Sequence, residues 1–236
     1  PLLIPFYIFV WNWQKDMKSR IVVGWSGGKD ATLALHDLVR QDNIEVASLL
    51  TTITEGCDRV SMHGVRRNLL EQQAEALGYA LETINIPQDC SNETYEERMR
   101  RSLEKLRRIG VHSAAFGDLF LQDIRCYREE RMSRIGMQCL FPLWGKPTPE
   151  TARRFINLGF RSIVVCVDTR ALDRRFAGLD YNEDFLKQLP LGVDPCGENG
   201  EFHTFVYDGP IFRKSVPVER GDIFLRNERF CCCDLT

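Results

Sequence analysis

The amino-acid sequence predicts an α/β protein, in which a Rossmann-like parallel sheet is followed by a smaller α+β domain. Three observations predict this fold. Short apolar runs alternate with amphipathic runs between residues 21 and 135. A glycine-rich turn follows the first apolar run, and after about Gly145 the chain becomes richer in Gly, Pro and Asp. Alternating strands and helices of this kind form a parallel sheet that helices cover.

The N-terminal part is predicted to contain four strands and four helices. Short apolar runs bounded by turn residues are typical of buried strands, and apolar residues three or four positions apart are typical of amphipathic helices. In such sheets ligands bind at the carboxyl ends of the strands, so the loops after the strands are the predicted binding region. The predicted strands are 21–25, 45–52, 81–86 and 113–116, and the predicted helices are 31–40, 66–77, 94–108 and 124–135.

The C-terminal part is predicted to begin with a helix at 149–158 and a strand at 161–167. Two or three further strands follow a stretch rich in Gly, Pro and Asp at 189–200. We therefore divide the chain into an N-terminal domain, residues 17–145, and a C-terminal domain, residues 146–236.

Residues 1–16 are largely apolar and unlike the rest of the chain. This segment is shorter than the ~20 residues that span a bilayer, and it lacks the basic region and cleavage site of a secretory signal. Because Met17 leads almost directly into the first predicted strand, we expect the natural chain to start there and residues 1–16 to be a non-native extension.

The chain has 236 residues, of which 44% are hydrophobic and 27% are charged, with a net charge of 31 − 33 = −2. This composition excludes disordered and disulfide-stapled proteins. It gives no electrostatic reason to expect nucleic acid or a membrane as a partner. The nine cysteines are odd in number and form no C-x-x-C pair, so neither a disulfide framework nor a zinc site is expected. They indicate a reducing, cytoplasmic location.

The segment Gly24-Trp-Ser-Gly-Gly-Lys-Asp30 joins the first predicted strand to the first predicted helix. Gly27 and Gly28 let the backbone approach an anion closely, and the helix N-terminus offers free N–H groups. Ser26 adds a hydroxyl group and Lys29 adds a positive charge, so the segment is predicted to bind phosphate. It is not a Walker A loop, because it is one residue short and Asp30 stands where Ser or Thr would be. The alternative is an ordinary glycine-rich turn that Ser26 caps.

The segment Asp194-Pro-Cys-Gly-Glu-Asn-Gly-Glu-Phe-His-Thr-Phe205 is the densest polar cluster of the chain. Carboxylates crowded on a turn are costly unless a cation or a reaction uses them. If a strand starts at Gly200, Glu201 and His203 share one of its faces. The residues alone favour equally a functional cluster and a turn that leads into a half-buried strand.

Both segments resemble those of a known enzyme superfamily. The first is similar to the pyrophosphate loop (PP-loop) of the ATP-pyrophosphatases, which have an adenine nucleotide alpha hydrolase-like fold of the HUP type; here Ala31 stands where their loop has Ser. Together the two segments resemble the diphthine–ammonia ligase family, and residues 116–130 resemble its bacterial branch, whose members are not expected to act on diphthine. The resemblance covers residues 18–212 and includes 62–65, 73–78, Gly117 with Asp118, Arg125 with Glu129, and 141–144.

The resemblance implies an ATP-dependent ligase with an ATP-binding PP-loop domain and a C-terminal substrate-binding domain. A carboxylate, either a small molecule or borne by a protein, attacks the α-phosphorus of ATP, and ammonia then displaces AMP to form an amide. Nucleotide contacts are implied for Ser26, Gly27, Gly28, Lys29, Asp30, His63 and Gly117, and contacts to Mg²⁺ for Asp30 and Asp118. Substrate contacts are implied for Asp118, Arg125, Glu129, Glu198, Asn199 and Thr204, and a direct part in the reaction for Lys29, Asp30, Glu198, Glu201 and His203.

Helical spacing supports part of this site. Asp118, Gln122, Arg125 and Glu129 recur at intervals of four, three and four residues, which places them on one face of a helix. We expect this face to point into the binding crevice. The alternative for Arg125 and Glu129 is a plain ion pair on the protein surface.

Two other functions remain open from the sequence. One is a PP-loop ATP pyrophosphatase that acts on another small metabolite or on tRNA, although the weak net charge argues against tRNA. The other is a regulator that binds adenine nucleotides without turning them over. The sequence is also compatible with a homodimer.

Overall fold

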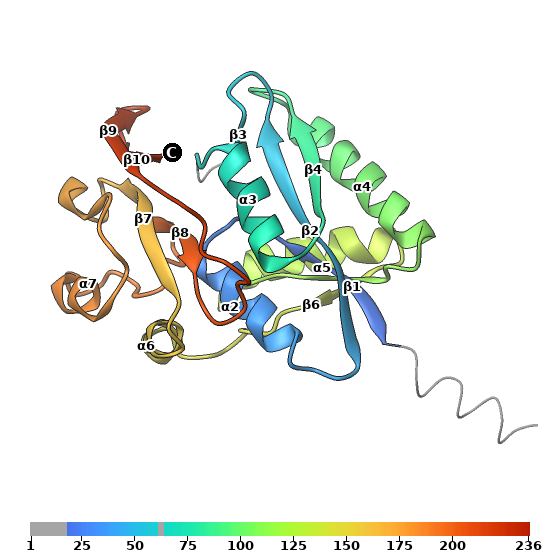
Figure 1. The fold of residues 1–236 in the computed structure, drawn as a ribbon. Helices are drawn as coiled ribbons and strands as arrows, with labels where there is room; N and C mark the ends of the chain where they lie inside the picture. Colours follow the sequence, from blue (N-terminus) through green and yellow to red (C-terminus); the bar gives the residue numbers. More distant parts are fainter. Residues whose placement is uncertain (1–17, 61–63) are drawn as a thin grey trace, which may run out of the picture.

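The computed structural model describes residues 18–60 and 64–236, which form two β-sheets and the helices around them (Figure 1). The strands of the N-terminal sheet are β1 (Ser19–Gly24), β2 (Ile44–Thr54), β3 (Arg59–Val60), β4 (Leu81–Ile86), β5 (Ser113–Ala115) and β6 (Gln138–Leu140). The sheet has the order β3-β2-β1-β5-β6, and β4 also pairs with β2. Strands β4, β2, β1, β5 and β6 run parallel, whereas β3 turns back antiparallel to β2.

Helices cover both faces of the N-terminal sheet, and the side chains of β1 show how. Ile21 and Val23 point to one face, where they join the buried side chains of α2 (Lys29–Leu38) and α3 (Arg67–Leu77). Val22 points to the other face, toward α4 (Asn92–Arg108) and α5 (Gln122–Arg134). Alternate residues of a strand point to opposite faces, so a strand covered on both sides is a continuous apolar run.

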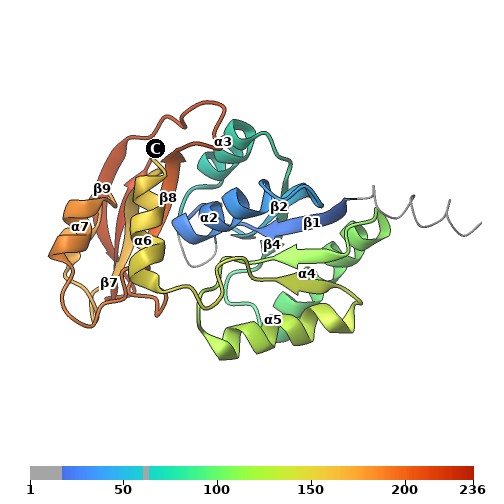
Figure 2. The same cartoon turned by 90° about the horizontal axis from the view of Figure 1, so that it is seen from below.

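The C-terminal unit is a second, antiparallel sheet. Its elements are α6 (Thr148–Asn157), β7 (Arg161–Asp168), the short helix η1 (Arg174–Phe176), α7 (Glu183–Gln188), β8 (Phe202–Asp208), β9 (Arg220–Arg226) and β10 (Phe230–Leu235). The strand order is β8-β7-β10-β9. One face packs against α6 and α7, and the opposite face shares a core with α2 and α3 of the N-terminal unit (Figure 2).

The structure confirms the predicted α/β fold and corrects several of its details. The first helix begins at Lys29 rather than at Ala31, with Gly28 as its N-cap. The short strands β3 and β6 were not predicted, because two or three residues are too few for a sequence pattern. The strand expected from Gly200 begins at Phe202. In the part of the chain that the structure describes, no helix has the length and apolar character needed to cross a membrane.

Candidate active site

A cavity of about 630 Å³ opens at the carboxyl ends of β1, β2 and β5. One wall is the segment between β1 and α2, and the facing wall is the C-terminal loop before β8 together with the start of β8. The cavity therefore lies where the topology of a parallel sheet places its ligand, and its volume suits a nucleotide. Both polar segments of the sequence, Ser26 to Asp30 and Cys196 to Thr204, contribute to its lining.

The turn between β1 and α2 is shaped by glycine and held by one buried glutamine. Gly27 has φ of +78°, and a Cβ atom there would lie 3.0 Å from the side-chain oxygen of Gln73. That oxygen accepts a hydrogen bond from the indole N–H of Trp25 at 2.7 Å, and the Gln73 amide donates to the Gly27 carbonyl at 3.0 Å. The amide also donates to the Val206 carbonyl of β8 at 2.5 Å. Gln73 thus fixes the turn to both α3 and the C-terminal sheet.

Strand β8 reaches across to the same turn. The Oγ1 atom of Thr204 accepts a hydrogen bond from the N–H of Lys29 at 3.0 Å, and the N–H of Val206 donates to the Gly27 carbonyl at 2.9 Å. The Ser26 hydroxyl accepts from the N–H of Gly28 at 3.3 Å. A helix leaves its first four N–H groups without backbone partners, so two of the four at this end are used here and two remain for an anion. The predicted substrate contact Thr204 lines the cavity, and its hydrogen bond also ties the two units together.

Lys29 lines the cavity, as expected for a residue of the phosphate-binding segment, and its side chain also contacts groups of both units. Its ammonium lies 2.8 Å from Oδ2 of Asp30 and donates a hydrogen bond to the carbonyl of Cys196, and the side chain is only 3% exposed. The ring centroids of Phe202 and Tyr181 lie 5.2 and 5.7 Å from it. The geometry makes Lys29 a positioning residue that holds the C-terminal loop against the PP-loop.

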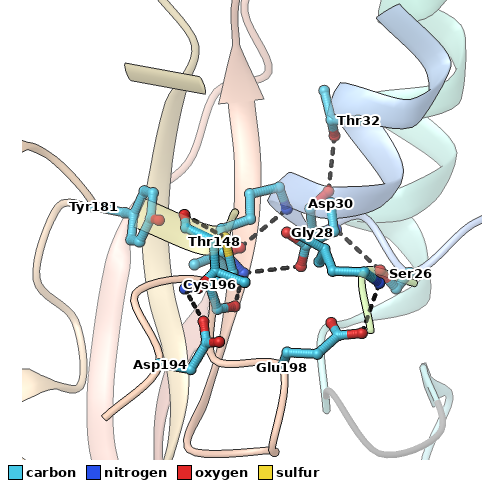
Figure 3. Close-up of polar contacts among 12 residues, drawn as sticks. Ser26, Gly28, Asp30, Thr32, Thr148, Tyr181, Asp194, Cys196 and Glu198 are labelled. Atoms are coloured by element: carbon cyan, nitrogen blue, oxygen red, sulfur yellow. Dashed lines mark hydrogen bonds and ion pairs between the residues drawn. The ribbon is translucent and has the colours of Figure 1, made fainter. Parts of the chain in front are cut away.

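The C-terminal loop from Asp194 to Glu201 is held by its own carboxylates. Oδ1 of Asp194 accepts a hydrogen bond from the N–H of Cys196 at 2.5 Å (Figure 3). Oε1 of Glu201 accepts from the N–H of Asp194 at 3.0 Å and from the side-chain amide of Asn199 at 2.9 Å. Glu201 is 6% exposed and does not line the cavity. Glu201, which was predicted to be catalytic, therefore stabilises the conformation of the loop. Asn199, by contrast, lines the cavity.

Glu198 is the carboxylate that the loop presents to the cavity. Its Oε1 accepts a hydrogen bond from the N–H of Leu119, in the loop after β5, at 2.7 Å. Burial raises the pKa of Glu198 to about 7; the nearby carboxylates of Asp30 and Asp118 add to this, and the hydrogen bond from Leu119 opposes it. At neutral pH this carboxyl group is therefore poised to take up or release a proton.

The pKa values of His203, Asp30 and Lys29, which also line the cavity, are shifted by burial and by neighbouring charges. Burial lowers the pKa of His203 to about 4, and the positive charges of Lys29 and Arg226 act in the same direction, so the imidazole is neutral at neutral pH. Burial also raises the pKa of Asp30, which the ammonium of Lys29 opposes. For Lys29 burial is the largest single effect and lowers the pKa, but Asp30, Cys196 and Glu198 together outweigh burial and raise it.

Gly117 brings the loop after β5 directly onto the start of α2. A Cβ atom at this position would lie 2.7 Å from the backbone carbonyl carbon of Asp30 and 2.9 Å from the nitrogen of Ala31. Only glycine permits this approach, which sets Asp118 beside the PP-loop. The structure thus places both residues of the predicted Gly117-Asp118 pair at the cavity wall.

Only part of the helix face predicted from the spacing of Asp118, Gln122, Arg125 and Glu129 lies at the cavity. Asp118 lines it and forms an ion pair with Arg128 at 2.8 Å. Arg125 and Glu129 do not line it; they pair with each other at 2.8 Å, and the Arg125 guanidinium lies 4.6 Å from the Trp144 ring centroid. Helix α5 begins only at Gln122, so Asp118 lies before the helix and the spacing counted from it gives the wrong face. The predicted nucleotide contact His63 lies outside the described residues.

The carboxylates around the PP-loop suit Mg²⁺ only if a nucleotide supplies further ligands. Among the described residues, no three His, Cys, Asp or Glu side chains are grouped closely enough to hold a metal by themselves. Mg²⁺ in nucleotide sites commonly uses one or two carboxylates, with phosphate oxygens and water completing its shell. Asp30 and Asp118 supply oxygen donors of this kind at the cavity wall, so the donor set fits a metal that arrives with a nucleotide.

Two family models match consecutive parts of this chain. The diphthamide synthase N-terminal domain matches residues 17–139, and the diphthamide synthase C-terminal domain matches residues 148–233. The chain belongs to the diphthamide synthase family. The two matched domains correspond to the two sheets, so the cavity of this family member lies between them.

Curated relatives and solved structures were compared with this diphthamide synthase family member. It is 26% identical to the human diphthine–ammonia ligase, with 88% of this chain and 86% of the relative covered. It is 24% identical to the zebrafish (Danio rerio) diphthine–ammonia ligase, with 89% and 90% covered. A structure of a predicted subunit of tRNA methyltransferase from Methanocaldococcus jannaschii aligns with a TM-score of 0.42 and 16% identity, over 84% of this chain and 99% of that one.

Two residues at the site were not predicted from the sequence. Gln73 is fully buried, and a polar residue on the apolar face of the helix at 66–77 is the signal that could have found it. Arg128 lines the cavity, pairs with Asp118 and lies over the Phe116 ring at 4.2 Å. No sequence signal distinguished Arg128 from the other arginines of α5, because the helix start decides which of them faces inward.

Proposed function

We propose that this protein is an ATP-dependent ligase that adenylates a carboxylate and then amidates it with ammonia. One observation carries the proposal: the PP-loop and Glu198, which come from the two family domains, face the same cavity. The carboxylate oxygen attacks the α-phosphorus of ATP and the bond to the β-phosphate oxygen breaks, releasing pyrophosphate. Ammonia then attacks the acyl carbon of the adenylate, and AMP leaves as the amide forms.

The PP-loop supports the first of these steps. The backbone of Gly27 and Gly28, the Ser26 hydroxyl and the N-terminus of α2 suit the phosphate groups of ATP. Mg²⁺, held by Asp30 and Asp118, would supply charge neutralisation for the leaving pyrophosphate. Lys29 contributes by keeping the C-terminal loop closed over this end of the cavity.

Glu198 supports the second step. Ammonium must lose a proton before its nitrogen can attack, and a carboxylate whose pKa is about 7 accepts a proton near neutral pH. His203 is neutral at that pH and lines the same cavity, where it suits a hydrogen bond to the substrate. Asn199 provides a further polar contact from the same loop.

The acceptor is proposed to be a carboxylate, either a small molecule or a group carried by a protein. The human and zebrafish relatives are named for diphthine and ammonia, so diphthine is the first acceptor to test. Because residues 116–130 resemble the bacterial branch of the family, carboxylates other than diphthine are the second group of acceptors to test. We place the reaction in the cytoplasm, where ATP and reduced thiols coexist.

The test is to incubate the protein with ATP, Mg²⁺, ammonium and candidate carboxylates, and to separate the nucleotides. We expect AMP and pyrophosphate in equal amounts, dependent on the correct carboxylate, and their loss in Glu198→Gln. Glu129→Gln, which removes an exposed carboxylate outside the cavity, is the matched control and should keep full activity. Formation of ADP and phosphate instead would contradict the chemistry. Tight ATP binding without turnover of any acceptor would favour the nucleotide-binding regulator.

We further propose that two copies associate through β9, the edge strand of the C-terminal sheet. Ile223, Phe224 and Leu225 are consecutive in this strand and are 58%, 41% and 56% exposed. An exposed apolar edge strand presents unpaired backbone groups and favours pairing with another strand. Antiparallel pairing of two copies centred on Phe224 would place Asp222 of each copy opposite Arg226 of the other, and Ile223 opposite Leu225. In this one register, opposite charges face each other across the two strands, and so do apolar side chains.

A further inference from the structure

Two cysteines form a close pair inside the C-terminal sheet. Cys166 of β7 and Cys232 of β10 lie directly opposite each other on adjacent antiparallel strands, and their sulfur atoms are 3.3 Å apart. Cys166 is 1% exposed and Cys232 is 5% exposed. The proposed ligase reaction uses neither thiol.

The backbone at this pair is compatible with a disulfide. Opposite residues of antiparallel strands have Cα atoms about 4.5–5.5 Å apart, and disulfides are found at Cα separations of about 4.4–6.8 Å. A disulfide bond is about 2.05 Å long, so rotation of the two side chains is enough to bring the sulfur atoms together. No strand has to move to close the bond.

A second cavity gives small molecules access to the pair. It has a volume of about 470 Å³ and adjoins the proposed active site at Val60, which lines both cavities. Cys232 lines it together with Arg59 and Arg226, which come from β3 and β9. Small oxidants fit a cavity of this volume, whereas Cys166 is reached only through Cys232, because it does not line the cavity.

The surroundings of Cys232 favour its thiolate, which is the reactive form of cysteine. The hydrogen bond with Cys166 lowers the pKa of Cys232 to about 7; burial opposes this, and the positive charges of Arg226 and Arg59 support it. The same hydrogen bond, with burial, raises the pKa of Cys166. Because Cys232 lines the cavity and Cys166 does not, an oxidant meets Cys232 first, and Cys166 is the thiol that then attacks the oxidised Cys232.

We propose that Cys166 and Cys232 form an oxidisable thiol pair, which a peroxide converts into a disulfide between β7 and β10. The Cys232 thiolate attacks one oxygen of hydrogen peroxide, the O–O bond breaks, and Cys232 becomes a sulfenic acid as hydroxide leaves and is protonated to water. The Cys166 sulfur then attacks the Cys232 sulfur, the S–O bond breaks, and a second water leaves. Two thiols and one peroxide thus give one disulfide and two waters.

The pair lies next to a residue of the proposed active site. On its other side, Cys166 is directly opposite His203 of β8, which lines the larger cavity. Cys232, Cys166 and His203 therefore form one row across three neighbouring strands. Closing the disulfide draws the Cys166 sulfur toward β10 and changes the packing beside His203.

The test is peptide mapping of the full-length protein after treatment with equimolar hydrogen peroxide. Trypsin places Cys166 in peptide 162–170 and Cys232 in peptide 230–236, because the chain has arginines at 161, 170 and 229. We expect these two peptides to appear joined, with a mass about 2 Da below the sum of the reduced peptides for the two hydrogens lost. Fragmentation of the joined peptides should show that Cys232, rather than Cys231 or Cys233, is bonded to Cys166. Treatment with a reductant should separate the two peptides again.

Two variants test which thiols take part in the cross-link. Cys57→Ser removes an exposed thiol that lines the same cavity and should leave the cross-link unchanged. Cys166→Ala should abolish the cross-link and leave Cys232 as a sulfenic acid that a 1,3-diketone traps. A cross-link that contains Cys57, or peptides 162–170 and 230–236 that stay reduced while Cys57 is oxidised, would overturn the proposal. Because the wild-type map decides between these outcomes, the test stands even if the alanine variant folds poorly.

Discussion

Glu198 and Glu201 lie three residues apart in one loop, and their contacts separate their roles. Glu201 accepts hydrogen bonds from Asp194 and Asn199 of its own loop, whereas Glu198 accepts from Leu119 across the cavity. Burial that raises a pKa is typical of groups that exchange protons in catalysis, and Glu198 has this shift. Of these two glutamates, Glu198 is therefore the one that we propose exchanges a proton in the reaction.

The raised pKa of Glu198 predicts a pH dependence. Only the carboxylate accepts a proton, so kcat/KM for AMP formation should rise as pH increases through about 7. Glu198→Gln keeps an oxygen for the Leu119 N–H and should lose this rise along with most of the activity. Ammonium itself also titrates, so the informative quantity is the difference between the wild-type and variant profiles at the same total ammonium. Identical profiles would show that Glu198 is not the base.

The buried position of Lys29 predicts a loss of stability as well as of activity. Lys29→Met leaves the Asp30 carboxylate and the Cys196 carbonyl without their partner, and breaking a buried ion pair costs about 3–5 kcal/mol. We expect a clear fall in the free energy of unfolding of the nucleotide-free protein, measured by denaturant titration. Lys187→Met, at a 70% exposed lysine, is the control and should change little. If Lys29→Met is as stable as the wild type, Lys29 does not hold the C-terminal loop, and its role is limited to binding the nucleotide.

At the scale of elements, the site depends on how closely the loop after β5 approaches α2. Gly117→Ala would put a methyl group 2.7 Å from the Asp30 backbone, and neither segment has a flexible side chain that can give way. We expect a destabilisation of about 1–3 kcal/mol and weaker ATP binding, measured by thermal unfolding and calorimetry. Gly221→Ala, whose methyl group would lie 3.2 Å from the Asp234 carbonyl oxygen at an exposed position of β9, should leave ATP binding unchanged.

Element boundaries also explain where sequence reasoning succeeded and failed. The Ser26-Gly-Gly-Lys-Asp30 segment was placed correctly between a strand and a helix, because glycines and apolar runs are local signals. The direction of the Lys29 side chain was not predictable, since its partner Cys196 is 167 residues away. Arg125 was expected in the crevice and Arg128 was missed, because a shift of the helix start changes the inward-facing residues.

At the scale of the whole molecule, the edge of the C-terminal sheet predicts a homodimer. Light scattering after size exclusion should give twice the chain mass for the wild type, and Phe224→Asp should give a monomer, because it places two carboxylates at the centre of the pairing. Asp222→Arg and Arg226→Asp should each weaken the dimer, and the double charge swap should restore it. A wild-type monomer, or a dimer that none of these changes affects, would exclude this interface.

The amino-acid sequence by itself determined the alternation of strands and helices and the position of the glycine-rich turn after β1, which it predicts to bind phosphate. It also singled out the segment from Asp194 to Phe205. These features rest on local patterns of apolar residues, glycine and charge, which neighbouring residues carry in the chain. Only the tertiary structure decided that Lys29 and Thr204 join the two units, that Glu198 rather than Glu201 faces the cavity, and that Cys166 meets Cys232. Each of these contacts links residues at least 66 positions apart. The packing of one sheet against the other makes the contacts of Lys29, Thr204 and Glu198, whereas the pairing of β7 with β10 inside the C-terminal sheet brings Cys166 to Cys232.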